Sequence, residues 1–268
     1  WKGAKSSLRE ILIDVVRAGD IRLVPDRFES TYFHWVENLR DWCISRQIWW
    51  GHRIPAFYRE NELQIAMKTP EGEGWEQDPD TLDTWFSSAL WTWSTLIDPD
   101  LAQDESISFE ELLRRSPDFQ KFHPTHVMET GYDILFFWVA RMILMTTFMI
   151  REVPFKTVYL HGLVRTRDGK KMSKSDPLTC IDPLESIRDY GTDALRLALI
   201  QGTGPGQDLR LYPEKLESCR RFANKVWNAG RYILMNIPSG TSLDPPQNVQ
   251  NEAARWLLYE LDLLIGKT

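Results

Sequence analysis

The middle of the chain alternates short apolar runs with a longer helical pattern, and this alternation constrains the fold more than any other feature. Residues 126–130 form a short strand pattern that ends at Gly131, and an apolar helical stretch follows at 134–150. A second buried strand pattern occupies residues 157–163. Strands joined through a helix pair in parallel, because the helix carries the chain back across the sheet. The sequence therefore predicts an α/β fold with a parallel sheet.

Helical periodicity also marks the regions on either side of this central unit. Four segments have it, and the third is long and amphipathic, with Pro213 near its start. These segments are 5–18, 192–200, 213–236 and 251–265, and the linkers in the C-terminal part are 204–213 and 237–250. We therefore expect an α-helical region after the sheet domain.

The apolar stretch at 134–150 is the most hydrophobic in the chain, so a membrane span has to be considered. It is short for a span, Arg141 lies in its middle, and Asp133 precedes it. A charged side chain inside a bilayer is costly. We therefore interpret this stretch as a buried core helix.

Cysteine usage bears on the cellular compartment. The three cysteines are widely spaced and form no CxxC pair, and no signal-peptide pattern is present. We therefore expect a reducing, cytoplasmic setting, without a disulfide framework or a protein-bound metal.

The acidic charge is concentrated in two segments. The chain carries 32 Lys and Arg against 38 Asp and Glu, a formal net charge of −6. Residues 60–83 hold eight acidic residues against Lys68 alone, and residues 97–118 hold seven against two arginines. The remainder is net positive, so the acidic total does not exclude a nucleic-acid or phosphate ligand. Residues 97–122 have the composition of a solvated acidic insertion, with a short helix near 109–114.

The most specific chemical motif is a basic loop, Lys171-Met172-Ser173-Lys174-Ser175, that follows Gly169. Residues 161–175 carry five basic residues against one acidic residue. Two lysines three positions apart suit a polyanion, because ammonium groups stabilise negative charge best when they are preorganised around it. From composition alone, a solvated basic loop is the more ordinary interpretation.

An ordered set of motifs covers roughly residues 20–235 and includes this loop. With its KMSKS sequence, the set resembles the class I aminoacyl-tRNA synthetases, and within them it is most similar to the valyl-tRNA synthetases. The other motifs are NLRDWCISRQ at 38–47, IWWGHRIP at 48–55, DTLDTWFSS at 80–88, ETGYDILFFWVARM at 129–142, HGLVR at 161–165, GPGQD at 204–208 and NKVWNAGR at 224–231. One short motif arises by chance, but an ordered set of this length does not.

The resemblance implies a reaction, a fold and a division of the chain. It implies ATP-dependent activation of valine and its transfer to tRNA(Val), with Mg²⁺ accompanying ATP. The implied fold is the second half of a Rossmann-like parallel-sheet catalytic domain, followed by an α-helical stem-contact region. The implied divisions are the outgoing segment of an editing insertion at 1–30, the C-terminal half of the catalytic domain at 31–203, the stem-contact region at 204–240 and the start of the anticodon-binding domain at 241–268.

The resemblance also implies roles for residues of the nucleotide site. In the family the loop lysines bind the ATP phosphates and stabilise the transition state, which implies Lys171 and Lys174 as catalytic residues. Further residues implied to bind ATP or the adenylate are Gly131, Asp133, His161, Gly162, Met172 and Ser173. From the residues alone, His161 is also interpretable as a core histidine, and Asp133 as a charge that stabilises a helix N-terminus. A position at the C-terminal end of a strand favours ligand binding for His161.

The tryptophans divide into two groups. The chain has 12, and eight of them fall between residues 35 and 93. The resemblance implies Trp50 and Trp85 as rigid apolar walls of the valine pocket, together with Thr81, whose hydroxyl needs a partner if it is buried. We interpret the following as core packing: Trp35, Trp42, Trp49, Trp91, Trp93 and Trp138.

The long helix at 213–236 carries a set of basic residues. The resemblance implies that they contact tRNA phosphates, which would add affinity without reading sequence. An ordinary solvated helix face is the alternative. The residues are Arg220, Arg221, Lys225 and Arg231.

The chain departs from the family at two points. No HIGH-type motif is present, since His123-Pro124-Thr125-His126 lacks the required glycine, so the N-terminal half of the catalytic domain is expected elsewhere. Asp176-Pro177 directly follows the KMSKS loop, where relatives carry a glycine-containing sequence. Two interpretations therefore stay open: part of an active synthetase, inactive by itself, or a non-catalytic synthetase-like protein that binds RNA or protein.

Overall fold

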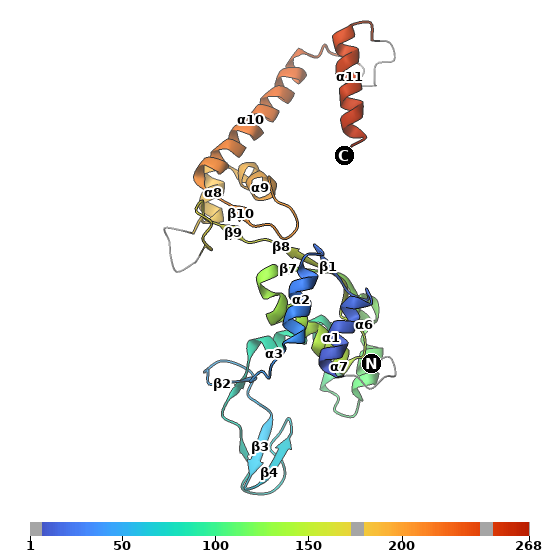
Figure 1. The fold of residues 1–268 in the computed structure, drawn as a ribbon, viewed down its shortest axis with the longest axis vertical. Coiled ribbons are helices and arrows are strands. Elements are labelled where there is room, and N and C mark those ends of the chain that lie inside the picture. Colours follow the sequence, from blue (N-terminus) through green and yellow to red (C-terminus); the bar gives the residue numbers. More distant parts are fainter. Residues whose placement is uncertain (1–6, 173–179, 242–248, 268) are drawn as a thin grey trace.

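A three-stranded parallel sheet lies at the centre of the molecule (Figure 1). In this computed structural model, which describes residues 7–172, 180–241 and 249–267, the strand order is β1 (Arg22–Val24), β8 (Phe155–His161) and β7 (Thr125–Gly131). Both outer strands run parallel to β8. The predicted α/β fold with a parallel sheet is therefore confirmed.

The connection from β7 to β8 is helical throughout most of its length. It consists of the 3₁₀ turn η2 (Tyr132–Ile134), the π-helical turn η3 (Leu135–Val139) and α7 (Ala140–Met149). By length and composition alone, Tyr132–Met149 could cross a membrane. One face of it is buried in the main core, however, through Leu135, Val139, Ala140, Met142 and Ile143. The interpretation as a core helix holds for this face.

Two N-terminal helices pack in the same core. In α1 (Leu8–Arg17), Ser7 and Glu10 form a capping box, and Gly19 adopts a φ of 77° just after the helix, as a C-terminal stop requires. Its apolar stripe and that of α2 (Phe28–Glu37) are buried with the sheet residues. The predicted segment 1–30 thus contributes both α1 and β1 to the central unit.

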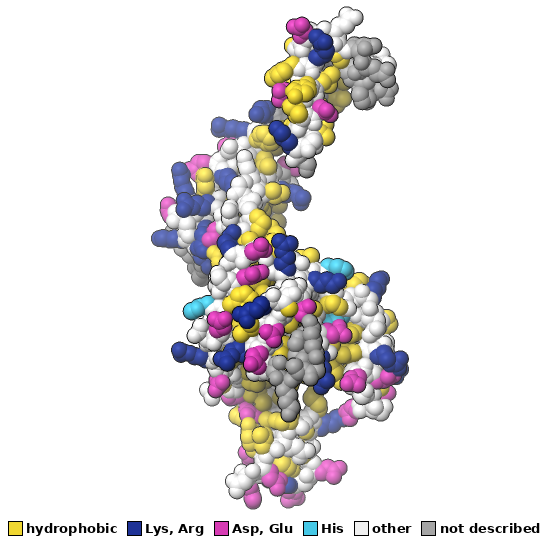
Figure 2. Space-filling view, turned by 45° about the vertical axis from the view of Figure 1, so that its right-hand side comes forward, with side chains coloured by type: hydrophobic (Ala, Val, Ile, Leu, Met, Phe, Trp, Pro, Cys, Tyr) yellow, Lys and Arg dark blue, Asp and Glu magenta, His cyan; other side chains and the backbone are white. Residues whose placement is uncertain are grey.

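Two small antiparallel sheets follow α2. The strands β2 (Ser45–Arg46) and β6 (Thr81–Leu82) pair with each other. A three-stranded sheet in the order β4-β3-β5 projects from the body at the lower end of Figure 1. Its strands are β3 (Ala56–Arg59), β4 (Glu62–Ile65) and β5 (Glu76–Gln77). Figure 2 shows acidic side chains gathered at this end.

The acidic segment at 97–122 is more ordered than its composition indicates. After α3 (Thr84–Ser88) and α4 (Trp91–Ser94), it forms the turn η1 (Leu101–Gln103) and the helices α5 (Phe109–Arg115) and α6 (Pro117–Phe122). Leu113 and Phe119 are buried with Trp93 in a small separate core. This segment is therefore packed on one side, because its few apolar residues share a face.

The C-terminal part is helical, as expected. The strands β9 (Val164–Arg165) and β10 (Leu209–Arg210) pair in parallel beside it. Its helices are α8 (Pro183–Tyr190), α9 (Thr192–Ile200), α10 (Pro213–Asn236) and α11 (Glu252–Ile265). The first part of α10 packs against α9 through Leu216 and Cys219, and the rest of α10 extends away from the body (Figure 1).

Candidate functional site

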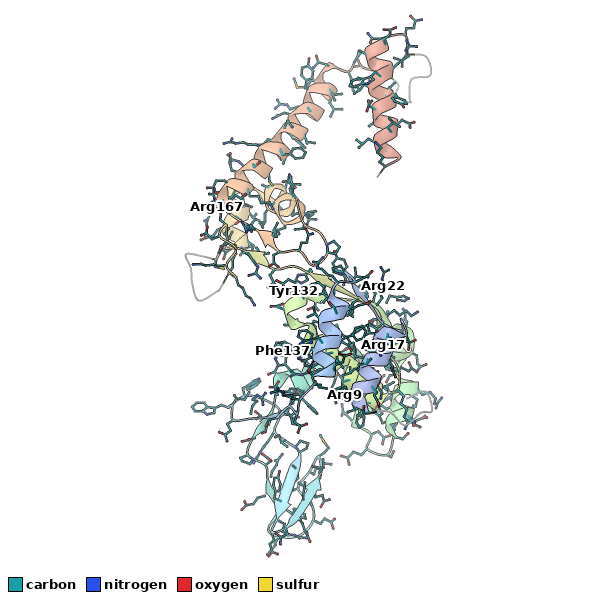
Figure 3. All side chains as sticks on the ribbon, viewed as in Figure 1. Arg9, Arg17, Arg22, Tyr132, Phe137 and Arg167 are labelled. Atoms are coloured by element: carbon teal, nitrogen blue, oxygen red, sulfur yellow. The ribbon has the colours of Figure 1, made fainter. Side chains whose placement is uncertain are left out.

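The register of the central sheet brings two predicted residues to the same edge. Gly131 at the end of β7 pairs with His161 at the end of β8. Parallel strands end at a common edge, and open α/β sheets bind ligands there. Figure 3 shows that Tyr132, the next residue after Gly131, lies at the upper end of the central body, on the side of β9 and β10.

The side chains at this edge lie close together. A Cβ atom on Gly131 would lie 2.7 Å from Oδ1 of Asp133 and 3.5 Å from Cε1 of His161, so a larger residue would displace the carboxylate. The His161 side chain is 46% exposed, and its Nε2 lies 3.5 Å from Oε1 of Glu129. The interpretation of His161 as a core histidine is therefore wrong.

Gly162 is required by a close backbone approach. A Cβ atom at this position would lie 1.8 Å from the carbonyl oxygen of Gln207 and 2.6 Å from the backbone nitrogen of Asp208. The HGLVR and GPGQD motifs, which are 39 or more positions apart in sequence, are thus in contact. A cavity of about 290 Å³ adjoins this contact and is lined in part by His161, Gly162 and Gln207.

Asp208 connects three parts of the site. Its Oδ1 accepts a hydrogen bond from the backbone N–H of Leu163 at 2.8 Å, and its Oδ2 accepts one from the Tyr132 hydroxyl at 3.0 Å. Arg165 donates to the same Oδ2 through Nε and reaches the Tyr132 oxygen through Nη2 at 3.1 Å. Although burial raises the pKa of Asp208, these hydrogen bonds outweigh it and lower the pKa overall.

Lys171 reaches back to the sheet edge. The turn that precedes it is closed by hydrogen bonds between Thr166, Gly169 and Lys170, and Lys171 forms an isolated bridge with Arg165. The ammonium of Lys171 lies 3.1 Å from Oδ2 of Asp133, with 66% and 33% of the two side chains exposed. A flexible cation and a carboxylate thus meet beside Gly131.

The structure describes only the first two residues of the predicted loop, Lys171 and Met172. The Met172 side chain is half-buried and packs against the core of α9 and α10. Ser173 and Lys174 lie outside the described residues. Their roles stay predictions.

The three residues predicted for the valine pocket have different environments. Thr81 is buried, and its hydroxyl finds a partner by donating to the carbonyl oxygen of Arg46 at 3.1 Å. Trp85 is half-buried, with its ring centroid 5.9 Å from that of Phe137. Trp50 is 92% exposed. The described residues do not enclose a pocket around Trp50, so its role stays a prediction.

The remaining tryptophans do not all pack as expected. Trp93 is buried, and Trp35 and Trp138 pack on the main core, as predicted. Trp49 is fully exposed, so its interpretation as core packing is wrong. Trp91 is 48% exposed and contacts Trp138.

Half of the predicted tRNA contacts already have acidic partners. Arg220 and Arg221 each lie 3.0 Å from the Glu217 carboxylate on the preceding turn of α10. The ammonium of Lys225 lies over the Phe222 ring, and Arg231 lines a cavity of about 710 Å³ between α9 and α10. This cavity is mostly apolar.

The sequence prediction missed the residues that organise the site. Tyr132, Arg165 and Asp208 all lie in recognised motifs, yet only their long-range contacts reveal their joint role. Within residues 7–172, 180–241 and 249–267, no group of three His, Cys, Asp or Glu side chains has a metal-binding arrangement.

A family comparison covers most of the chain. The family described as tRNA synthetases class I (I, L, M and V) matches residues 1–75 and 62–212. Among solved structures, Mycobacterium tuberculosis methionyl-tRNA synthetase in complex with methionyl-adenylate matches 97% of this chain and 45% of its own, with a TM-score of 0.68 and 20% identity. A ternary complex of Agrobacterium radiobacter LeuRS, tRNA and LeuAMS matches 85% of this chain and 33% of its own, with a TM-score of 0.61 and 22% identity.

Curated relatives are more similar in sequence. Valine--tRNA ligase of Clostridium tetani is 47% identical over 99% of this chain, and that of Geobacillus kaustophilus is 49% identical over 98%. Valine--tRNA ligase of Bacillus subtilis is 49% identical over 90%. The chain spans 29%, 29% and 26% of the lengths of these three relatives.

Proposed function

This chain belongs to the class I tRNA synthetases, and we propose that it is the C-terminal half of the catalytic domain of a valine--tRNA ligase, with the stem-contact region attached. The reaction is activation of valine by ATP to valyl-adenylate and pyrophosphate, followed by transfer of valine to tRNA(Val). The identity of 47% to a valine--tRNA ligase over nearly the whole chain supports valine as the substrate.

The observation that carries the proposal is the meeting of Lys171 and Asp133 beside Gly131 at the end of a parallel strand. In the proposed reaction, Lys171 stabilises the negative charge that develops on the ATP phosphates, as a preorganised cation does. Asp133 accepts hydrogen bonds from the ribose hydroxyls, and His161 and Gly162 lie against the adenosine. Lys174 joins Lys171 at the phosphates, and Met172 and Ser173 contact the nucleotide.

The amino-acid side of the proposed site is formed by Trp50, Trp85 and Thr81. Two indole rings provide rigid apolar walls, and Thr81 supplies a small side chain whose hydroxyl is already bonded to backbone. Such a pocket discriminates against a missing or added methylene by only about 1–3 kcal/mol. Mg²⁺ enters with the ATP phosphates, and no ligand of this chain is assigned to it. The proposed compartment is the cytoplasm.

Valine-dependent exchange of pyrophosphate into ATP tests the proposal in a full-length enzyme that carries this chain. We expect exchange with valine in the wild type, and a loss of kcat of about 100-fold or more in Lys171→Ala and Lys174→Ala with little change in KM for valine. Lys68→Ala is the matched control, because it removes another exposed lysine that forms an ion pair outside the site, 2.7 Å from Glu105.

The 268-residue chain by itself is expected to show no exchange, because half of the phosphate site is missing from it. Robust exchange by the isolated chain would contradict the proposed half-site. The alternative, a non-catalytic RNA- or protein-binding relative, is favoured by Asp176-Pro177 after the loop. A full-length protein with an upstream HIGH-type motif but no exchange with any amino acid would support that alternative.

A further inference from the structure

We propose that Asp208 is a positioning residue that holds the Lys171 turn against the Gly131–Asp133 element, and this inference rests on the proposed function. The resemblance and the comparisons assign Asp208 no role. It lies in the GPGQD segment, more than 35 positions after Lys171 in sequence, yet its carboxylate contacts both sides of the nucleotide site.

The contacts of Asp208 define two connections. The first runs through Tyr132, whose hydroxyl donates to Asp208 at 3.0 Å and whose backbone lies between Gly131 and Asp133. The second runs through Arg165, which also donates through Nη1 to the carbonyl oxygen of Gly169 at 3.3 Å. Gly169 belongs to the turn that carries Lys171. The carboxylate therefore fixes the distance between the turn and the sheet edge.

The chemistry of this contact requires a carboxylate. Leu163, Tyr132 and Arg165 all donate hydrogen bonds to Asp208. Two carboxylate oxygens accept all three, whereas an asparagine amide offers only one accepting atom and would turn an N–H₂ group toward a donor. The Arg165 and Asp208 side chains are only 27% and 28% exposed, so water compensates poorly for a lost partner.

A misplaced turn is expected to act on the chemical step. Displacing a catalytic group by about 1 Å can cost about 100-fold in rate. Within the described part of the chain, Asp208 forms no hydrogen bond with Trp50, Trp85 or Thr81, so valine binding is not expected to depend on it. The predicted signature is a fall in kcat and in kcat/KM for ATP, with KM for valine preserved.

The experiment uses the full-length enzyme and valine-dependent ATP–pyrophosphate exchange. Asp208→Asn is expected to lower kcat by at least about 10-fold with KM for valine changed less than about 2-fold, and Asp208→Glu to recover part of the rate. Lys68→Ala is the matched control, because its exposed ion pair to Glu105 lies outside the site and away from the turn that carries Lys171. It is expected to retain the wild-type kcat.

The outcomes separate this inference from the proposed function. Absence of exchange in the wild type refutes the proposed function. The positioning role alone is overturned if the wild type shows exchange and Asp208→Asn keeps its kcat. It is also overturned if the KM of Asp208→Asn for valine rises by the same factor by which its kcat falls. If Asp208→Asn does not fold, Tyr132→Phe decides, since it keeps the carboxylate and removes one donor to it, together with one acceptor of Arg165. A fall in its kcat of about 3-fold or more supports the inference, and a smaller change overturns it.

Discussion

The ammonium of Lys171 and the carboxylate of Asp133 lie 3.1 Å apart across 38 positions of sequence. In the proposed reaction, Lys171 binds phosphate and Asp133 binds ribose, so each is the other's partner only until the nucleotide replaces that contact. Before the nucleotide binds, the ion pair thus keeps both groups at the site and neutralises their charges.

The first prediction concerns the stability contributed by this pair. Lys171→Met is expected to change the free energy of unfolding by less than about 1 kcal/mol, because exposed ion pairs gain little over water. Chemical denaturation of the protein measures this change, with Asp133→Asn as a second variant of the same pair. A loss of several kcal/mol would show that the pair is structural and would contradict its proposed exchange for nucleotide.

Gly162 supports a prediction about packing at the site. Gly162→Ala is expected to destabilise the protein by about 1–3 kcal/mol, because its Cβ would collide with the backbone at Gln207. Gly230→Ala in the middle of α10 is the matched control, since nothing lies within 4 Å of its Cβ position. That control is expected to gain about 0.5–1 kcal/mol from the lower entropy of the unfolded chain. Equal effects of the two variants in thermal unfolding would contradict the close approach.

The position of Trp85 depends on Asp83. This buried carboxylate accepts a hydrogen bond from the Trp85 backbone N–H at 2.7 Å as the N-cap of α3, and it pairs with Arg46. Asp83→Asn keeps an accepting oxygen for the cap but loses the ion pair, whereas Asp83→Ala loses both. We expect the alanine variant to be less stable than the asparagine variant by about 1 kcal/mol, the usual value of a cap. Denaturation midpoints of the two variants that coincide would exclude a capping role.

His123 gives the folded protein a dependence on pH. Its side chain is almost fully buried, its ring stacks on Phe119, and Oε2 of Glu152 lies 3.6 Å from Nε2. Burial lowers its pKa below the ordinary value of 6.5, against the opposing effects of Glu152 and of the Thr92 backbone. His123 therefore takes up a proton at a higher pH in the unfolded chain than in the folded protein. The stability of the folded protein falls as the pH drops through about 6.5.

The test for His123 compares unfolding at several values of pH. In His123→Phe, which preserves the stacked ring, the part of the stability loss between pH 7.5 and about 5.5 that comes from this residue is expected to disappear. A variant with the same pH profile as the wild type would show that His123 does not titrate on unfolding.

The elements of the fold were predictable where periodicity is strong. The strand ending at Gly131 and the helix bounded by Gly19 follow from local apolar spacing and from glycine, and both occur as predicted. The packing of the 97–122 segment was not predictable, because Leu113 and Phe119 form a core only when Trp93 packs against them. Composition indicates how polar a segment is, but not which residues pack against one another in the fold.

The site was predictable only in part for a similar reason. Gly131 and His161 stand out as strand ends, and the structure pairs them. Asp208 was missed because its partners come from three segments, and a carboxylate in a loop has no local signature of that role. The prediction for Trp49 was wrong because indole rings are buried on average. Whether a particular ring is buried depends on which other segments of the chain pack against it, and Trp49 is fully exposed.

The pairing of Gly131 with His161 determines where the protein can change length. A residue inserted within β7 would place Thr130 or Tyr132 opposite His161 and turn every following side chain to the other face of the sheet. A residue inserted after α7, in the turn at 150–154, would leave that pairing intact. Length variation among descendants of this sequence is therefore expected in the turn and not in the strand.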